Sequence, residues 1–397
     1  MSLAAVKTPS DPLIESLRAE AREAPPSGIV EVRDYGWGRE GLIPLWVGEG
    51  DLPTPSFISE TATRALAAGE TFYTYQRGIP ELRQALADYH TRVYGGSFSP
   101  ERFFVTGGGM QAVQIALRMV AGAGDEVLLP TPAWPNFRAA MELNGAKAVP
   151  VKMELKDRAW TLDLDRLAAA VTPRTRALFI NSPANPTGWT ATRDELAQIL
   201  ALARKHGLWI IADEIYGRFV FDGSARAPSF HDVMAEDDRI IFVQTFSKNW
   251  AMTGWRIGWL ETSPKLGAVV ENLIQYSTSG VATFMQRAAI TALERGESFL
   301  EHQIARARTN RDLLENGLGS SNRISFARTN GAFYFFFSVA GFEDSMTLAK
   351  ELIDKAGVGL APGSAFGPGA EKYLRLCFAR RSDHIEETVR RIAGFLT

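Results

Sequence analysis

The chain has 397 residues, of which 46% are hydrophobic and 22% are charged, and its formal net charge is −2. This length predicts two or three domains, and the near-neutral charge gives no electrostatic basis for binding nucleic acid or an anionic membrane. One cysteine, Cys377, excludes an intramolecular disulfide framework or a cysteine-rich zinc site, and together with the lack of a leader-like or membrane-spanning apolar run it predicts a cytoplasmic protein.

The N-terminal region is predicted to be an arm that leads into a turn-rich loop. Residues 4–28 are polar and rich in Ala and Pro, which indicates an arm or short helix followed by an extended linker. The apolar run 42–47 then enters a loop over 48–55, and Pro80 opens an amphipathic helix.

From about residue 100 to 260, apolar strands alternate with helical segments. A capping box at Thr192–Glu195 opens the clearest of these helices. Continuous apolar strands that alternate with helices indicate a mainly parallel sheet covered on both faces. The predicted strands are 103–106, 126–130, 177–181, 208–212 and 240–246.

After about residue 285 the pattern changes to that of a smaller α+β domain. Its predicted elements are a long charged helix over 284–316, a strand at 323–326, the aromatic run 333–337, a helix near 345–356, a strand at 373–379 and a closing helix. We therefore predict an N-terminal arm and part of the small domain over 1–50, a large domain over 51–284 and the small C-terminal domain over 285–397.

The chemically specific residues follow the predicted sheet strands, where open α/β sheets bind ligands. Lys248 lies just beyond the strand that begins at Ile240. A lysine there, partly desolvated and near Arg256, would have a lowered pKa and could form a Schiff base, although most lysines after strands are solvated. The hydroxyls of Thr245 and Ser247 and the guanidinium of Arg256 are groups that bind an anionic phosphate.

A glycine-rich segment, Gly107–Ala112, follows another strand and opens a helix. It includes Gly108, Gly109 and Met110, and its backbone N–H groups could approach an anion at the helix N-terminus. The segment also fits the G-x-G-x-x-A dinucleotide fingerprint, and a tight strand–helix turn explains the same residues without any ligand.

Four strand-end or strand residues each allow a functional and a structural interpretation. Trp134 could stack on a flat ring or pack in the core, and Asn185, held extended before Pro, could present a rigid amide or form a turn. Asp213, with Tyr216 just beyond it, could pair with a protonated pyridine nitrogen or with an Arg or helix end. Arg375 lies in an apolar strand pattern, so its guanidinium is expected either to form a salt bridge or to bind a substrate carboxylate.

Together these residues supply a Schiff-base lysine, a carboxylate for a ring nitrogen, a stacking indole and a phosphate cradle. A pyridoxal phosphate site needs this set of groups. Their joint occurrence at successive strand ends favours such a site over the separate structural explanations.

From Gly48 to the C-terminus the chain resembles the class I/II aminotransferases, which are fold-type I pyridoxal phosphate enzymes similar to aspartate aminotransferase. Thr245–Gly258 matches the lysine signature of that family except at Thr245, where the family usually has Ser or Gly. Asn185–Gly188 and Asp213–Tyr216 match its other specific motifs. The resemblance implies a seven-stranded, mainly parallel sheet and a small domain built from both ends of the chain.

The resemblance implies a role for each matching residue. Lys248 would bind the cofactor and shuttle a proton, Asp213 would hold the pyridine nitrogen protonated, and Asn185 and Tyr216 would bond the phenolic oxygen. Trp134 would stack on the ring. The phosphate would be held by Gly108, Gly109, Met110, Thr245, Ser247 and Arg256.

The remaining implied roles concern the substrate and a second subunit. Arg375 would grip the substrate α-carboxylate in a pocket lined by Gly48 and Asn185. Tyr73 resembles the tyrosine that reaches the phosphate of a neighbouring subunit, which implies a homodimer. The implied reaction is ping-pong transamination between an L-amino acid and a 2-oxo acid.

Two departures from the family pattern bear on specificity. Gly50 replaces the usual proline of a G-E-P-D loop, so this loop is expected to be more flexible. Met110 stands where several aspartate-accepting relatives carry a lysine, so an apolar or aromatic amino donor is expected here rather than an acidic one.

Three other functions use parts of the same pattern. A pyridoxal phosphate lyase that cleaves a C–S or related bond would need the same residues, so the sequence leaves it open. A cofactor-binding regulator lacks a basic helix-turn-helix segment before residue 30. A nicotinamide oxidoreductase would rest on Gly107–Ala112 alone. The histidines lack metal-ligand spacing, so no metal is predicted.

Overall fold

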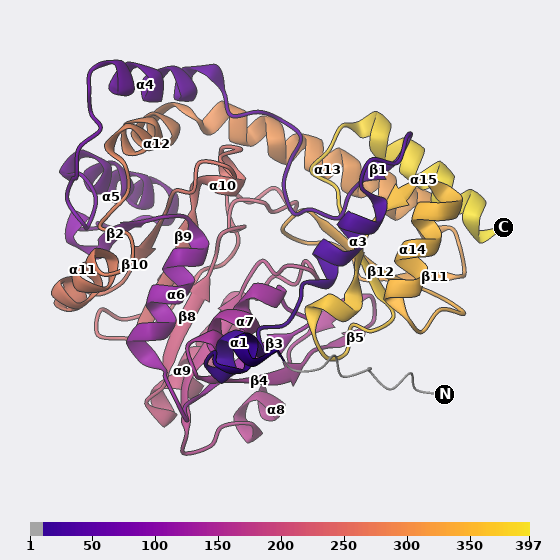
Figure 1. Cartoon of the computed structure of the whole chain (residues 1–397), viewed down its shortest axis with the longest axis horizontal. Coiled ribbons are helices and arrows are strands. Elements are labelled where there is room, and N and C mark those ends of the chain that lie inside the picture. Colours follow the sequence, from indigo (N-terminus) through magenta and orange to yellow (C-terminus); the bar gives the residue numbers. More distant parts are fainter. Residues whose placement is uncertain (1–10) are drawn as a thin grey trace.

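The computed structural model describes residues 11–397, and its largest element is a seven-stranded sheet (Figure 1). The strand order is β2, β10, β9, β8, β7, β3, β4, and the run from β9 to β4 is parallel. β10 is antiparallel to both of its neighbours. The predicted seven-stranded, mainly parallel sheet is therefore confirmed. Its strands are β2 (Phe103–Thr106), β3 (Glu126–Thr131), β4 (Lys147–Lys152), β7 (Thr175–Asn181), β8 (Trp209–Asp213), β9 (Ile240–Thr245) and β10 (Gly258–Glu261).

Alternate side chains of the central strands enter two different apolar cores. Ile241 and Val243 of β9 pack against α6, α7 and α11, whereas Phe242 faces the core that contains α8 and α9. A sheet buried on both faces explains the uninterrupted apolar runs in the sequence. The helices around it are α4 (Ser56–Ala67), α5 (Pro80–Tyr94), α6 (Gly109–Val120), α7 (Pro135–Leu143), α8 (Leu164–Ala169), α9 (Arg193–His206), α10 (Phe246–Asn249), α11 (Gly267–Gln275) and α12 (Thr283–Arg295).

A second, four-stranded antiparallel sheet has the order β11, β12, β15, β14 (right side of Figure 1). The N-terminal segment joins this part of the chain, because β1 pairs in parallel with β13. The elements here are α3 (Gly28–Gly36), β1 (Ile43–Pro44), α13 (Glu297–Gly319), β11 (Ile324–Phe326), β12 (Tyr334–Val339), α14 (Ser345–Ala356), β13 (Val358–Gly359), β14 (Ala361–Pro362), β15 (Tyr373–Cys377) and α15 (Ser382–Leu396). A hairpin of β5 (Glu154–Lys156) and β6 (Ala159–Thr161) lies outside both sheets.

Several predicted elements need correction. The single long helix expected over 284–316 is two helices, α12 and α13, that meet at Gly296, where a Cβ would overlap the Trp250 indole. The strand expected to reach residue 246 ends at Thr245, and Phe246 begins α10. The arm contains two one-turn helices, α1 (Pro12–Glu15) and α2 (Ala19–Arg22), and its first ten residues lie outside the described residues.

No helix within residues 11–397 combines the length and the apolar character needed to cross a membrane.

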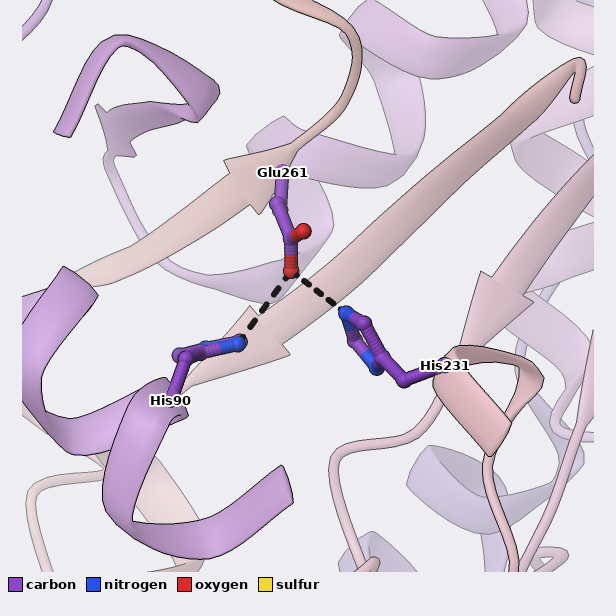
Figure 2. Close-up of side chains that lie close together, drawn as sticks. All are labelled: His90, His231 and Glu261. Atoms are coloured by element: carbon purple, nitrogen blue, oxygen red, sulfur yellow. Dashed lines mark hydrogen bonds and ion pairs between the residues drawn. The ribbon is translucent and has the colours of Figure 1, made fainter. Parts of the chain in front are cut away.

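The fold brings together two histidines and a glutamate that are far apart in the sequence (Figure 2). Glu261 Oε2 lies 2.9 Å from His231 Nε2 and 3.2 Å from His90 Nδ1, and Arg102 donates to Glu261 Oε1 at 2.9 Å. The spacing along the chain did not reveal this group, whose ligand atoms lie within 4.8 Å of one another. Because Trp259 donates to His90 Nε2, neutral His90 carries its proton on Nδ1, which favours a hydrogen-bonded network over metal binding.

This network also holds the end of β8. Ser229 Oγ lies 2.9 Å from His231 Nδ1 and donates to Glu214 Oε2 at 2.6 Å, and the Phe230 amide donates to Glu214 Oε1. Burial raises the pKa of Glu214. Although burial alone would do the same to Glu261, its contacts with His231 and His90 hold the pKa of that carboxyl well below its usual range. The strand that ends at Asp213 is thus tied to β10 through buried polar side chains.

We predict that Glu261→Gln destabilises the fold much more than the loss of a surface carboxylate. The variant leaves Arg102 without its buried anion, and breaking a buried pair costs roughly 3–5 kcal/mol. The matched control is Glu142→Gln, whose exposed i,i+4 pair with Arg138 contributes about 0.5 kcal/mol or less. Denaturant unfolding of the two variants measures the difference, and equal losses would contradict the assignment.

Candidate functional site

A cavity of about 320 Å³ lies where β7, β8 and β9 end, between the large sheet and the segment that follows β1. Its walls combine apolar side chains with a few charged and amide groups. The lining residues are Ser27, Ile29, Val30, Arg33, Trp46, Val47, Gly48, Glu49, Trp134, Asn136, Phe137, Asn181, Asn185, Ile215, Tyr216, Lys248, Thr253, Tyr334 and Arg375. Six predicted site residues therefore meet here: Gly48, Trp134, Asn185, Tyr216, Lys248 and Arg375.

Lys248 reaches the cavity from the short helix α10. Thr245, the last residue of β9, caps that helix by accepting from the Ser247 amide at 3.1 Å. Lys248 Nζ donates to the Gly48 carbonyl oxygen at 2.6 Å. Burial lowers the pKa of Lys248 to about 8, and nearby Arg375 acts in the same direction. The amine is therefore easier to deprotonate than a surface lysine.

Asp213 ends β8 and is almost fully buried. Asn181 Nδ2 donates to its Oδ1 at 3.0 Å. Burial raises the pKa of Asp213 to about 7. A carboxylate in this position is stabilised most by a cationic group, because the hydrogen bonds from the Asn181 side chain and, at 3.5 Å, from the Ile215 amide replace only part of its hydration.

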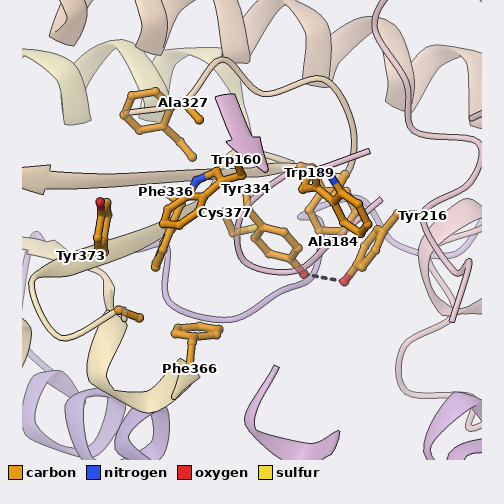
Figure 3. Packing of buried hydrophobic residues seen from close by; sticks show 14 of the residues in the cluster. Trp160, Ala184, Trp189, Tyr216, Ala327, Tyr334, Phe336, Phe366, Tyr373 and Cys377 are labelled. Atoms are coloured by element: carbon orange, nitrogen blue, oxygen red, sulfur yellow. Dashed lines mark hydrogen bonds between the residues drawn. The ribbon is translucent and has the colours of Figure 1, made fainter. Parts of the chain in front are cut away.

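Tyr216 lies just beyond Asp213 and faces Tyr334 of the small sheet. Their hydroxyl groups are 2.6 Å apart, and Figure 3 shows them pointing at one another. Both rings are buried, and burial raises the pKa of both phenols, so both stay protonated at neutral pH. A Cβ on Gly48 would overlap the Tyr334 hydroxyl, so only glycine fits there.

Arg375 is a buried guanidinium in the middle of the small sheet, paired with Phe336 and Ala361 of the adjacent strands. It donates to Asn185 Oδ1 at 2.9 Å and to the Trp46 carbonyl oxygen. Within residues 11–397 no carboxylate pairs with it, and its Nε has no hydrogen-bond partner. Among the described residues the structure thus excludes the salt-bridge alternative left open by the sequence, and the guanidinium donates only to neutral oxygen atoms.

Arg375 is also packed between two aromatic rings. Its guanidinium carbon lies 4.6 Å from the ring centre of Tyr334 and 4.9 Å from that of Phe366. These contacts stabilise the cation and fix the plane of the fork. The guanidinium is therefore already oriented before any ligand arrives.

The predicted phosphate residues form a cradle beside the cavity rather than in its lining. Gly108, with φ of 83°, precedes α6, and a Cβ there would lie 2.7 Å from Arg256 Nη2. Gly109 lies beside the Thr245 side chain, and Met110 follows it in the first turn of α6. Arg256 Nη1 donates to the carbonyl oxygen of Thr253, which lines the cavity. The backbone at Gly108 lies close to the Arg256 guanidinium, and the first N–H groups of α6 have no partner within the helix. Together these groups can bind a compact anion.

Trp134 and Tyr73 differ in their surroundings. Trp134 lines the cavity and makes an edge contact with Phe137, with ring centres 5.3 Å apart. Tyr73 does not line the cavity, and it is 94% exposed on the surface of the chain. Its predicted contact is with a second subunit, so the single chain leaves that prediction untested.

Sequence reasoning missed three groups that shape this cavity. Tyr334 bonds Tyr216, Asn181 bonds Asp213, and the Trp46 carbonyl oxygen accepts from Arg375. Tyr334 is the one tyrosine in the aromatic run 333–337. Because the hydroxyl of a buried tyrosine needs a hydrogen-bond partner, this residue could have been predicted to contact a polar group. Nothing in the sequence indicates the Trp46 carbonyl.

Comparison with known proteins relates this site to one family. The model of the family "Aminotransferase class I and II" matches residues 41–392. The chain is 35% identical over 358 residues to an aspartate aminotransferase of Thermotoga maritima, covering 90% of this chain and 92% of that protein. It is 34% identical over 356 residues to an arginine–pyruvate transaminase of Pseudomonas aeruginosa, covering 89% and 90%. The solved structure of N-succinyldiaminopimelate aminotransferase from Mycobacterium tuberculosis matches it with a TM-score of 0.89 at 30% identity, covering 96% of this chain and 100% of that one.

We predict that Asp213→Asn stabilises the ligand-free protein above pH 7. An aspartate in the unfolded chain ionises near pH 4, whereas the pKa of buried Asp213 is about 7. The wild type therefore loses stability as the pH rises between these values, by about 1.4 kcal/mol for each pKa unit. Asn keeps the hydrogen bond from Asn181 but does not ionise.

Thermal unfolding of protein freed of bound ligands tests this prediction. Asp213→Asn should unfold at a higher Tm than the wild type at pH 8 and at a similar Tm at pH 4. Asp237→Asn, at an exposed carboxylate, serves as the control and should change Tm little at either pH. A Tm difference independent of pH would contradict the proposed cost of burying the Asp213 charge.

Proposed function

Because this chain belongs to the class I and II aminotransferases, we propose that the cavity around Lys248 is its active site and that the predicted site residues act there. The protein is a pyridoxal phosphate-dependent aminotransferase, which moves an amino group between an amino acid and a 2-oxo acid. The observation that carries the proposed site is the meeting of Lys248 and Arg375 in one cavity, with buried Asp213 directly behind it.

The residues present fit pyridoxal phosphate in charge and shape. At Gly108 the backbone comes so close to Arg256 that a Cβ would lie 2.7 Å from its Nη2, which brings the start of α6 and a guanidinium together as a phosphate requires. Within residues 11–397 no cation forms an ion pair with Asp213, and a pyridinium nitrogen would supply one. When bound, the cofactor supplies an aldehyde for the amino group and an electron-accepting ring. Thr245, Ser247, Gly108, Gly109 and Met110 would hold the phosphate with Arg256, and Trp134 would cover the ring.

Each catalytic side chain of the chain has one task. Lys248 Nζ, with its lowered pKa, accepts the proton from the substrate Cα and returns a proton during the second half of the reaction. Burial disfavours the charge of Asp213, so a protonated ring nitrogen beside it would stabilise the ionised carboxylate. Asn185 and Tyr216 donate hydrogen bonds to an anionic phenolic oxygen, which protonated Tyr216 can do at neutral pH.

Substrate orientation falls to Arg375 and its neighbours. Its unpaired fork would take the α-carboxylate of an amino acid or 2-oxo acid, while Asn185 and Gly48 line the same space. A carboxylate bound there would lie in the same cavity as the Lys248 amine, and both side chains contact the segment 46–48. The same set of residues serves both halves of a ping-pong exchange.

The division into domains is a further part of the proposal. Residues 51–284 would form the large domain, and 285–397 would form the small one with the N-terminal segment up to 50. Pairing of β1 with β13 and contacts of α3 with α14 support that grouping. The only cysteine of the chain, Cys377, is buried and unbridged, which supports a cytoplasmic location.

The test of the proposed function is a half-reaction with a panel of amino acids. The visible absorption band of the purified enzyme should change on mixing with a donor and return when a 2-oxo acid is added. Lys248→Ala should lose at least about 10³-fold in rate, because the proton acceptor is gone. Lys355→Ala, at a surface lysine paired with Glu351, is the matched control and should retain full rate.

Product analysis separates this reaction from the alternative lyase chemistry. A transaminase yields a 2-oxo acid in amounts equal to the amino acid consumed and needs an acceptor to continue. Release of ammonia and pyruvate without an acceptor would instead favour cleavage of a C–S or related bond. Formation of the 2-oxo acid by Lys248→Ala at the wild-type rate would contradict the role of this lysine.

We also propose that the enzyme is a homodimer in which Tyr73 completes the neighbouring site. Phe72, Tyr73 and Tyr75 are 84%, 94% and 64% exposed, and Tyr276, on a segment close in space, is 85% exposed. The two segments lie next to each other, as the close approach of Gly280 to Tyr75 shows. A Cβ built on Gly280 would lie 3.4 Å from the Tyr75 carbonyl oxygen. Such a group of exposed aromatic rings marks an interaction surface.

Sedimentation equilibrium tests the dimer, with an expected mass of twice the 43.6 kDa of one chain. Phe72→Ser combined with Tyr276→Ser should shift the equilibrium toward monomer, because buried aromatic area drives association. Tyr73→Phe should leave the dimer intact and weaken cofactor binding about tenfold by removing one hydrogen bond to the phosphate. A wild-type monomer with full activity would contradict the proposal.

A further inference from the structure

The Tyr334 side chain lines the active-site cavity, but it has no task in the transamination proposed above. Its hydroxyl oxygen lies 2.6 Å from that of Tyr216 and 3.5 Å from the Gly48 carbonyl oxygen. Its ring centre lies 4.6 Å from the guanidinium carbon of Arg375. One side chain therefore contacts the phenolic donor, the carbonyl that accepts from Lys248, and the carboxylate fork.

The small sheet holds Tyr334 in a fixed position. The residue begins β12, where it is paired with Cys377 of β15, and its side chain is fully buried. The Thr329 hydroxyl donates to its carbonyl oxygen at 3.2 Å. The rings of Phe333 and Tyr334 both meet the Tyr216 ring edge to face, with centres 5.2 and 5.6 Å away (Figure 3). Tyr216, which follows the end of the large sheet, is thus held by Tyr334 and the residue before it.

The distances decide which of the two hydroxyl groups donates. Each phenol carries one proton, and burial raises the pKa of both, so both protons are retained at neutral pH. The Gly48 carbonyl oxygen, at 3.5 Å, lies beyond the usual O–H···O range and already accepts from Lys248, whereas the Tyr216 oxygen lies well within that range. Tyr334 is therefore the donor, and the proton of Tyr216 remains available to another acceptor.

We propose that Tyr334 is a positioning residue that directs the Tyr216 proton toward the cofactor. The inference rests on the proposed function, in which Tyr216 donates a hydrogen bond to an anionic phenolic oxygen. By donating to the Tyr216 oxygen, Tyr334 blocks the opposite direction of this bond, and a hydroxyl that accepts a hydrogen bond becomes a stronger donor. The same ring fixes the plane of the Arg375 guanidinium, so the contacts to the cofactor and to the α-carboxylate share one support.

The test is the pH dependence of the visible absorption band of the holoenzyme, measured at equilibrium without substrate. A donor aimed at the anionic oxygen lowers the affinity of the bound cofactor for a proton, so a weaker donor moves the transition of the band to higher pH. Tyr334→Phe keeps the ring and removes the hydroxyl, and it should raise the midpoint by about 0.3 to 1 pH unit. Tyr216→Phe removes the donor itself and should raise it further.

Tyr373→Phe is the matched control for this titration. Tyr373 is a buried tyrosine of the neighbouring strand β15 that lies outside the lining of the active-site cavity. Its substitution removes one buried hydroxyl from the same sheet without touching Tyr216. The midpoint of the band should therefore stay at the wild-type pH.

A double-mutant cycle separates positioning from a general loss of structure. Because Tyr334 acts through Tyr216, adding Tyr334→Phe to Tyr216→Phe should produce no further shift of the midpoint. Additive shifts, or a shift for Tyr216→Phe with none for Tyr334→Phe, would overturn the positioning role. A midpoint unchanged in Tyr216→Phe, or the lack of any band that titrates, would instead overturn the proposed function of this site.

Calorimetry with butyrate, an unreactive carboxylate, tests the contact between the ring and the guanidinium. Tyr334→Phe keeps an aromatic face against Arg375 and should change the dissociation constant by less than about twofold. Tyr334→Leu removes that face and should weaken binding about three- to tenfold. Equal affinities of the two variants would overturn the role of the ring in orienting Arg375.

Discussion

The hydrogen bond from Lys248 Nζ to the Gly48 carbonyl oxygen joins the end of the large sheet to a segment that pairs with the small one. Because Tyr334 occupies the space where a Gly48 side chain would lie, the backbone itself comes close enough to accept from the lysine. Arg375 donates to the carbonyl of Trp46, two residues earlier. Both cations are thus positioned by a single short stretch of backbone, and its placement determines the distance between the Lys248 amine and the Arg375 guanidinium.

Buried charge is the second constraint on this arrangement. Among residues 11–397 neither buried Asp213 nor buried Arg375 has an ion-pair partner, and each would be more stable with a ligand of opposite charge. Packing on both faces of the sheet, and the buried network through Glu214 and Glu261, keep the end of β8 from relaxing toward water. The stability of the fold therefore offsets the cost of holding a site whose charges are satisfied only when ligands bind.

The parts of this site that could be predicted are those that follow strands. Parallel strands in one sheet end at the same edge, so Asp213 and Lys248 were expected to lie close together before any coordinates were known. Contacts between distant segments could not be predicted in that way. The hydroxyl groups of Tyr216 and Tyr334 form a hydrogen bond although these residues are 118 positions apart in the sequence. Likewise, whether Arg375 forms an ion pair depends on residues that only the fold brings near it. The break at Gly296 was missed as well, and the close approach of the Trp250 ring, which requires glycine there, joins two segments that are distant in the sequence.

The wall of the cavity formed by α3 lies on a different part of the fold from the residues at the strand ends. The strand-end residues are held by the large sheet, whereas α3 is held by buried Val32, by the contact of Gly36 with the Trp46 ring and by polar contacts with α14. Relatives with about a third of their residues identical are named for aspartate and for arginine, two donors of opposite side-chain charge. A helix that presents Arg33 and two apolar residues can change its cavity-facing side chains without disturbing Lys248 or Asp213. Specificity can therefore diverge on this scaffold while the chemistry at the strand ends stays the same.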